Sequence, residues 1–141
     1  MQQFGQFIIN HWELFLALAI ILFLLMSDGL SDKVLGFKEL QPGGVTEQIN
    51  RHNAAVLDVR EEEDFKQGHI VNAIHAPLST LEADIKKLEK LKGRPLIVTC
   101  QKGDRSARGA AVLRKQGFDP VYKLAGGLIA WRSAKLPLVT A

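Results

Sequence analysis

The chain lacks the residues that mark a disulfide-stabilised, metal-binding or nucleic-acid-binding protein. Its 141 residues include one cysteine, so an internal disulfide is impossible, which fits a reducing compartment. Its four histidines show no metal-ligand spacing with one another or with the cysteine, and we therefore expect no metal. No cofactor is expected either. Residues 27–141 hold all 18 Lys and Arg residues and 14 of the 15 acidic residues, an excess of positive charge too small to indicate nucleic acid as a partner.

The first 26 residues lack basic side chains and are mainly apolar. From Leu14 to Met26 the apolar run is unbroken, and Trp12 fits an interfacial anchor. Twenty helical residues span roughly 30 Å, the thickness of a bilayer core. A cleaved signal peptide is disfavoured because no basic region precedes the run and no small-residue cleavage site follows it; a buried core helix is a further alternative. Residues 1–26 are therefore predicted to form one transmembrane helix that anchors the chain in a lipid bilayer.

The distribution of lysines predicts the orientation of this anchor. Lys33 and Lys38 follow the span closely, and no basic residue precedes it. The positive-inside rule then places the rest of the chain in the cytoplasm, as a single-pass protein that suits a bacterial inner membrane. Residues 27–36 read as a short polar linker, and residues 37–141 are long enough for one domain.

The pattern after the linker alternates between strands and helices. We expect buried strands over residues 54–59, 73–76, 96–99 and 120–124, with an edge strand near 37–40. We expect helices over residues 46–52, 79–91, 106–116 and 128–133, and a helical first turn over 61–64. Strands that alternate with helices are typical of an α/β fold, here a five-stranded, mostly parallel sheet flanked by helices.

Cys100 stands where a buried strand meets a polar loop and a helix. The strand ends at Thr99, and an alanine-rich helix follows the loop. The unpaired N–H groups and the partial positive charge of a helix N-terminus favour thiolate, the reactive form of cysteine. A buried structural cysteine is the alternative. Because the next residues are polar and turn-forming, we expect the sulfur at the surface of a pocket, as a catalytic nucleophile.

The loop after Cys100 holds the candidate substrate-binding residues. Arg105 offers a planar fork suited to an oxyanion, and Lys102 offers a point charge, although both could be solvated loop cations. Gly103 frees the backbone to curl around an anion, whereas Asp104 is expected to face solvent or to cap the helix that starts near Ser106. The predicted binding set is Gln101, Lys102, Gly103, Asp104, Arg105 and Ser106.

Three residues on other segments are candidate supporting residues. Asp58 and Arg60 close the second strand, and strand carboxyl ends line the ligand crevice of a parallel sheet. For Asp58 a structural ion pair is the favoured role. His69 follows a glycine in a turn; a half-buried histidine with satisfied hydrogen bonds is favoured over a general base.

Taken together, these segments resemble the rhodanese-like domain, a family of sulfurtransferases. Three motifs carry the resemblance in order: 57–60 (Leu-Asp-Val-Arg), 68–73 (Gly-His-Ile-Val-Asn-Ala) and 100–106 (Cys-Gln-Lys-Gly-Asp-Arg-Ser). Residues 125–131 fit the last helix of the family, so the similarity covers about residues 37–137. Asn72 departs from the usual glycine.

The resemblance implies a thiosulfate sulfurtransferase. Cys100 would take sulfane sulfur from a small donor such as thiosulfate and pass it, from a persulfide, to a thiol or to cyanide. A membrane-tethered, non-catalytic interaction module is the alternative, and either role allows another membrane protein as a partner. A phosphatase or arsenate reductase is less favoured, because the loop between Cys100 and Arg105 is one residue shorter than theirs and Thr99 stands where they commonly have histidine.

Overall fold

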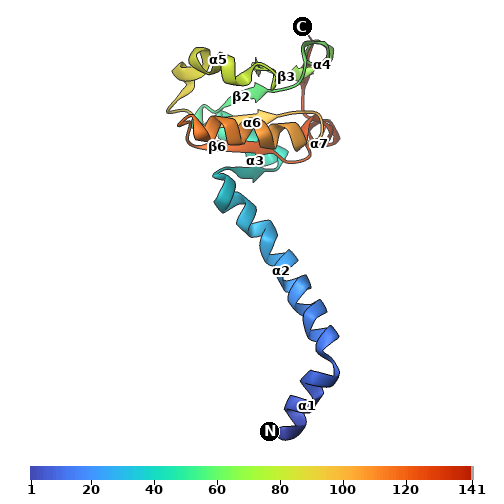
Figure 1. Ribbon diagram of the computed structural model, residues 1–141. Helices are drawn as coiled ribbons and strands as arrows, with labels where there is room; N and C mark the ends of the chain where they lie inside the picture. The colour runs from blue at the N-terminus through green and yellow to red at the C-terminus, as the bar shows by residue number, and fades with distance from the viewer. Residues whose placement is uncertain (141) are drawn as a thin grey trace. The chain divides into compact units, whose positions relative to one another are not determined.

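The computed structural model describes residues 1–140, except that the side chains of residues 27–35 lie outside the description (Figure 1). The chain forms two compact units, Met1–Val34 and Leu35–Ala141. The predicted linker over residues 27–36 falls almost entirely on residues outside the described side chains. Each unit is considered by itself below.

The N-terminal unit consists of two helices rather than the single helix predicted. Helix α1 spans Gln2–Asn10 and helix α2 spans Trp12–Leu35. His11 separates them with φ −129° and ψ 31°, outside the helical region, although its N–H still donates to the Phe7 carbonyl at 3.1 Å. The polar pair Asn10-His11, which interrupts the apolar run, thus coincides with the break. Every side chain up to Met26 is exposed.

The break at His11 determines whether this unit contains a single helix long enough to cross a membrane. Among the described residues, no one helix combines the length and the apolar character that crossing a bilayer requires. The pair Gln2–Asn10 and Trp12–Met26, bent by 74°, meets both criteria when taken together.

The C-terminal unit is built on a five-stranded parallel sheet, as the sequence predicts. The strands are β1 (Lys38–Leu40), β2 (Ala55–Asp58), β4 (Ile74–His75), β5 (Leu96–Thr99) and β6 (Val121–Leu124). Their spatial order is β1-β6-β5-β2-β4, which places β5 in the centre. Register pairs Asp58 with Thr99, so the carboxyl ends of β2 and β5 lie side by side. Cys100 therefore follows the central strand at the edge where an α/β sheet binds ligands.

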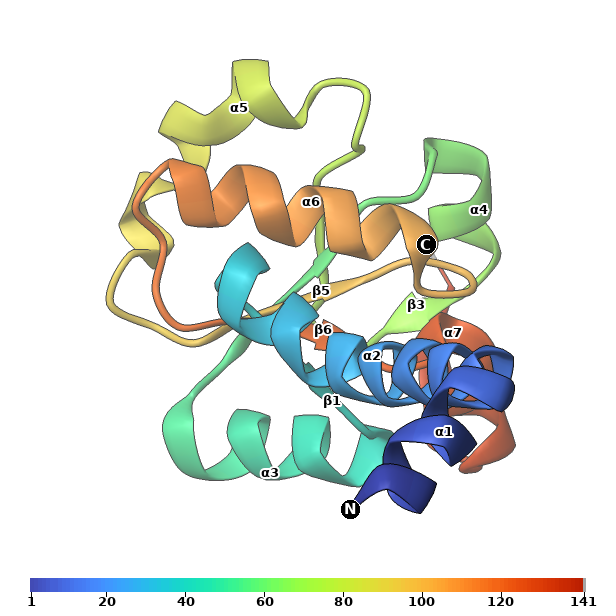
Figure 2. The same cartoon turned by 60° about the horizontal axis from the view of Figure 1, so that its bottom comes forward.

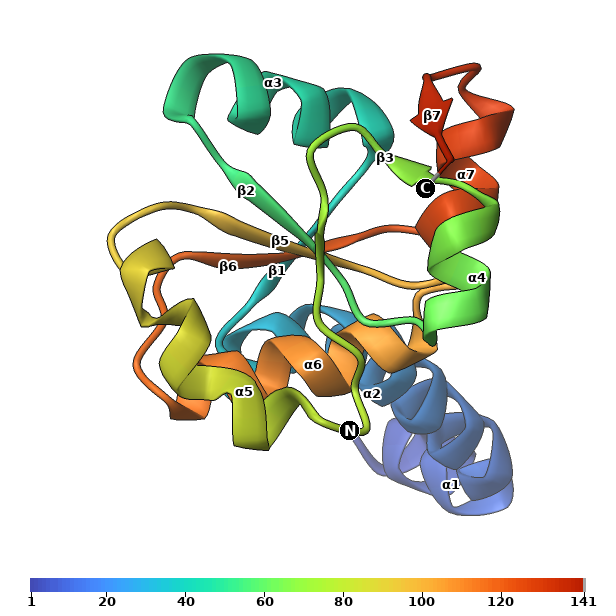
Figure 3. The ribbon, with the colours of Figure 1, turned by 90° about the horizontal axis from the view of Figure 1, so that it is seen from above.

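Helices cover both faces of this sheet (Figures 2 and 3). One face carries α5 (Leu81–Leu88), its 3₁₀ extension (Glu89–Leu91) and α6 (Asp104–Lys115); the other carries α3 (Pro42–His52) and α7 (Gly127–Ser133). Successive strand residues point to opposite faces. Leu57 and Val98 accordingly join the core under α5 and α6, whereas Val56 and Ile97 join the core under α3 and α7.

Three local features differ from the sequence-based expectation. Helix α3 begins at Pro42 instead of Thr46, because proline suits the first helical position and Val45 is fully buried, which outweighs the cost of the two glycines between them. Helix α6 begins at Asp104, two residues early. The residues expected to form a turn at His69 instead make strand β3 (His69–Ile70), which pairs antiparallel with β7 (Leu138–Val139). A short helix, α4 (Glu62–Gln67), precedes β3.

Candidate active site

The loop from Cys100 to Gly103 connects the central strand to helix α6. Gly103 has φ 112°, in the left-handed region, and is the N-cap residue of the helix. A residue without a Cβ adopts this conformation at little cost. The turn at Gly103 brings the first amides of α6 back toward the cysteine that opens the loop.

Two of these amides donate hydrogen bonds to the Cys100 sulfur. The Gly103 N–H lies 2.9 Å from Sγ and the Ser106 N–H lies 3.3 Å from it. The Ser106 hydroxyl, 3.5 Å from Sγ, donates its own proton to the Gly103 carbonyl at 2.9 Å. The remaining bond runs from the thiol to Oδ1 of Asp104, at 3.8 Å. The sulfur thus sits in a cradle of backbone donors.

The sulfur is buried, whereas the sequence led us to expect it at the surface of a pocket. Cys100 has an exposed fraction of 0% and belongs to the hydrophobic core under α5 and α6. Lys102 in this loop, and Asp104 and Arg105 in the first turn of α6, are charged and exposed. Among the described residues bonded to the sulfur, only Asp104 reaches solvent.

The Asp104 carboxyl is held in its charged form. The backbone N–H of Arg105 and then that of Asp104 itself lower its pKa below the usual value, and the Arg105 charge and the Cys100 thiol add to the effect. Burial acts in the opposite direction, and its effect on the pKa ranks below those of the two backbone N–H groups but above that of the Arg105 charge. Hydrogen bonds to the ionised form stabilise that form. The loop therefore presents one carboxylate between two cationic side chains.

Asp58 and Arg60 form a buried ion pair at the end of β2. Their exposed fractions are 0% and 2%. Arg60 donates from Nε to both carboxylate oxygens, at 2.9 and 3.1 Å, and from a terminal nitrogen at 2.7 Å. This bidentate geometry is the kind that offsets the desolvation of a buried pair.

Arg60 also connects the pair to the loop after Cys100. One terminal nitrogen donates to the Gly68 carbonyl at 2.7 Å, and the other donates to the side-chain oxygen of Gln101 at 3.3 Å. A single buried guanidinium thus joins three segments: the end of β2, the turn before β3 and the candidate catalytic loop. The structure places Asp58 and Arg60 beside the predicted binding set through this contact.

His69 lies in a separate aromatic stack. It is 8% exposed, and its Nδ1 lies 2.8 Å from the Phe65 carbonyl. The Phe65 ring stacks on His69 at 3.8 Å between centroids and on His75 at 4.5 Å, and His75 Nε2 lies 2.8 Å from the Arg60 carbonyl. No hydrogen bond of the described residues joins His69 to Cys100. Its surroundings are those of a packed, hydrogen-bonded histidine.

Helix α7 holds the same loop from another side, a contribution that sequence reasoning missed. The Leu128 N–H donates to the Cys100 carbonyl at 2.9 Å, and the Ile129 N–H donates to the Gln101 carbonyl at 3.3 Å. Gly127 has φ 60°, and a Cβ there would lie 2.6 Å from the Gln101 carbonyl oxygen and closer still to that of Cys100. The signal was the glycine pair at 126–127, which directly precedes the helix expected over residues 128–133.

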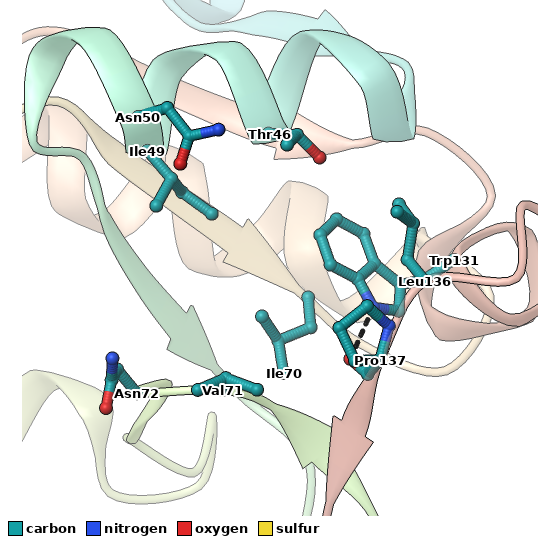
Figure 4. Close-up of a pocket in the computed structure, with 9 residues that line it drawn as sticks. All are labelled: Thr46, Ile49, Asn50, Ile70, Val71, Asn72, Trp131, Leu136 and Pro137. Carbon is teal, nitrogen blue, oxygen red and sulfur yellow. Dashed lines mark hydrogen bonds between the residues drawn. The ribbon is translucent and has the colours of Figure 1, made fainter.

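A cavity of about 250 Å³ lies elsewhere, between helix α3 and the β3–β7 pair (Figure 4). The Trp131 ring forms one wall, and its indole N–H donates to the Pro137 carbonyl at 3.1 Å. None of the predicted site residues lines this cavity. Within the described part of the chain no cluster of His, Cys, Asp or Glu has the arrangement of a metal site.

Comparisons with known proteins match this architecture. The model of the family described as Rhodanese-like domain matches residues 42–134. The uncharacterized protein YibN of Escherichia coli K12 is 34% identical, over 99% of this chain and 98% of its own length. Thiosulfate sulfurtransferase GlpE of Coxiella burnetii is 31% identical, over 69% of this chain and 89% of its own. The crystal structure of a rhodanese-related protein from Thermoplasma volcanium superposes with a TM-score of 0.67 at 30% identity, covering 74% of this chain and 100% of that one.

Proposed function

Because the chain belongs to the rhodanese-like domain family, we propose that it is a membrane-anchored sulfurtransferase that carries sulfane sulfur as a persulfide on Cys100. The observation that carries the proposal is the pair of backbone N–H groups, from Gly103 and Ser106, aimed at the Cys100 sulfur. Donors fixed in this way stabilise negative charge on sulfur, and they need no reorganisation when the reaction begins. The similarity to thiosulfate sulfurtransferase GlpE supports the same chemistry.

The first half-reaction loads the sulfur. The Cys100 thiolate attacks the outer sulfur of a donor such as thiosulfate, and a sulfur–sulfur bond forms as the bond within the donor breaks. Sulfite leaves with the electron pair of the broken bond. The new persulfide anion lies at the N-terminus of α6, where amides and the helix dipole favour negative charge.

The second half-reaction transfers the outer sulfur from Cys100 to an acceptor. A thiolate or cyanide attacks the outer sulfur of the persulfide, and the Cys100 thiolate is the leaving group. The enzyme returns to its starting state, and the acceptor leaves as a persulfide or as thiocyanate. Two displacements at one sulfur define a ping-pong cycle through a covalent intermediate.

The other loop residues have supporting roles in this scheme. Arg105 and Lys102 neutralise the anion of the donor, because both are exposed beside the cradle. Gln101, held by the buried Asp58–Arg60 pair, keeps the loop in place. His69 belongs to the packing around Phe65, not to proton transfer.

The N-terminal unit would attach this domain to a bilayer, on the cytoplasmic face of a bacterial inner membrane. The supporting observation is its surface: apolar side chains such as Phe4, Leu14 and Phe23 are exposed along both helices. An exposed apolar surface of that extent marks a contact with lipid or protein. The acceptor could then be a thiol of another membrane protein.

Intact-mass measurement tests the catalytic proposal. The full-length protein in mild detergent is treated with thiosulfate, beside a Cys100→Ser variant. We expect the native chain to gain the mass of one sulfur atom and to lose it when cyanide or a thiol is added, with formation of thiocyanate or a persulfide. The variant should gain nothing.

The contrary result is equally informative. If thiosulfate, glutathione persulfide and methanethiosulfonate all leave the mass unchanged while Cys100 remains a free thiol, the chain is not a sulfurtransferase. The tethered interaction module then becomes the better reading, and its binding should survive Cys100→Ser.

Extraction of membranes tests the attachment. We expect the full-length protein to stay with the bilayer at alkaline pH and to dissolve only in detergent, as insertion of an apolar helix requires. A variant that lacks residues 2–26 should appear in the soluble fraction. Release of the full-length chain by alkali alone would show that the N-terminal unit does not insert.

A further inference from the structure

Asp104 is the one exposed residue among the described hydrogen-bond partners of the Cys100 sulfur. Its Oδ1 lies 3.8 Å from Cys100 Sγ, whereas the other partners of the sulfur, Gly103 and Ser106, are buried. Because the sulfur itself has no exposed surface, a donor reaches it only if part of its surroundings moves. Of the described hydrogen-bond partners of the sulfur, Asp104 is the one whose side chain is exposed and charged, so its carboxylate lies next to the nucleophile.

The charge of Asp104 opposes the charges around it. Lys102 and Arg105 lie in the same loop and are exposed, and the Arg105 charge helps to keep the Asp104 carboxyl ionised. Asp104 thus partly offsets the Arg105 charge beside the Cys100 sulfur. It also faces the backbone amides at the start of α6, which are the groups that would receive an anionic part of a donor.

From this geometry we infer that Asp104 is a specificity-determining residue: its carboxylate disfavours molecules that carry negative charge next to the atom attacked by Cys100. The inference rests on the proposed function to the extent that these molecules are sulfur donors. A dianion such as thiosulfate is disfavoured relative to a donor with less charge beside the transferred sulfur, which is the case for the persulfide of a thiol.

Alkylation of Cys100 tests this without any sulfur transfer. Iodoacetate and iodoacetamide have nearly the same size and react with the same thiolate, but only iodoacetate is an anion. The chain has one cysteine, so intact mass reports one site. In Asp104→Asn we expect the ratio of the iodoacetate to the iodoacetamide rate constant to rise about fivefold, the effect of one charge some 5 Å away in a mostly aqueous setting. The increase should shrink in concentrated salt.

Two further variants make the result specific. Asp104→Glu keeps the charge and should keep a ratio close to that of the native chain. Glu47→Gln removes an exposed carboxylate from α3, on the opposite face of the sheet, and should leave the ratio unchanged. An unchanged ratio in Asp104→Asn would overturn the inference, and so would a Cys100 that reacts with neither reagent in the folded protein.

Donor kinetics separate this inference from the proposed function. We expect Asp104→Asn to raise kcat/KM for thiosulfate, a dianion, several-fold more than for methanethiosulfonate, a monoanion. If neither donor forms a persulfide but the alkylation ratio shifts, the sulfurtransferase proposal fails and the charge selection stands. If both donors work and neither ratio shifts, the charge selection fails alone.

Discussion

The loop that opens with Cys100 has two sides of opposite character. Its inner side, made by Arg60, Gln101, Gly127 and Leu128, is a set of buried or backbone contacts with defined partners. Its outer side, made by Lys102, Asp104 and Arg105, is exposed and charged. Both sides lie within a few residues of the same sulfur.

Under the proposed function, the difference separates two tasks of this short segment. Backbone donors can stabilise a sulfur anion only if they stay in place, and the inner side supplies that rigidity through contacts that cannot be satisfied elsewhere. Selection among molecules needs charges that solvent can reach, and the outer side supplies those. Substitutions on the inner side should therefore change stability and catalysis together, whereas substitutions on the outer side should change selectivity.

The largest effect is expected from breaking the inner ion pair. Arg60→Ala leaves Asp58 buried without its partner, which should lower the free energy of unfolding by about 3–5 kcal/mol. Urea unfolding of the full-length protein in mild detergent measures this, with tryptophan emission as the signal. Trp131 is buried and Trp12 is exposed, so the change in emission follows the C-terminal unit.

An exposed ion pair provides the matched control. Arg51 pairs with Glu47 at 3.3 Å on the surface of α3, where Arg51 is 74% exposed. Arg51→Ala should cost about 0–1 kcal/mol. Equal losses in the two variants would show that the inner side is not the rigid support described above.

A smaller but more local effect is expected at Gly127. In Gly127→Ala the methyl group meets the carbonyl oxygens of Cys100 and Gln101, and the left-handed backbone adds about 1–2 kcal/mol of strain. We expect lower stability and a marked loss of persulfide formation, because the loop must move. Gly43→Ala on α3 has open space and should gain about 0.5 kcal/mol. Full persulfide loading in Gly127→Ala would contradict a supporting role for α7.

The smallest effect concerns pH and the outer side. The pKa of Asp104 is lowered in the folded chain, so its contribution to stability is present above the unfolded pKa and is lost as pH falls through the folded pKa. Thermal melts should show Asp104→Asn slightly below the native protein at neutral pH, with the difference closing in acid.

Asp84 provides a comparison for the stability measurement on Asp104. Its pKa is lowered chiefly by the hydrogen bond to the Lys87 side chain, so the effect of Asp84→Asn should weaken in 1 M salt. Since backbone N–H groups dominate at Asp104, its effect should persist there. A parallel loss of both effects in salt would show that Asp104 responds mainly to the Lys102 and Arg105 charges.

Much of the fold followed from local patterns in the sequence. The apolar runs at 54–59, 96–99 and 120–124 contain β2, β5 and β6, because strands buried on both faces leave a nearly continuous apolar signal. The pair β3–β7 was not predicted. Its strands have two residues each and lie far apart in the sequence, so neither has a periodicity of its own.

The candidate site followed from the sequence only in part. Cys100 and its loop were found because strand, loop and helix are contiguous. The contact from Arg60 to Gln101 and the contact from Leu128 to the Cys100 carbonyl were not, because they join residues 41 and 28 positions apart through packing. The break at His11 was also not predicted. A run of apolar residues indicates a helix that could cross a membrane, but it does not show whether that helix is straight or bent.

The burial of the one thiol in the chain has a consequence for how this cysteine meets other proteins. A disulfide requires two Cα atoms within about 7 Å of each other, an approach that a fully enclosed cysteine does not permit to a second folded chain. The resting thiol is thereby protected from oxidative crosslinking between copies. In the proposed persulfide the terminal sulfur would lie about 2 Å beyond Sγ, so an acceptor thiol would attack an atom that stands farther from the backbone of Cys100 than the resting sulfur does.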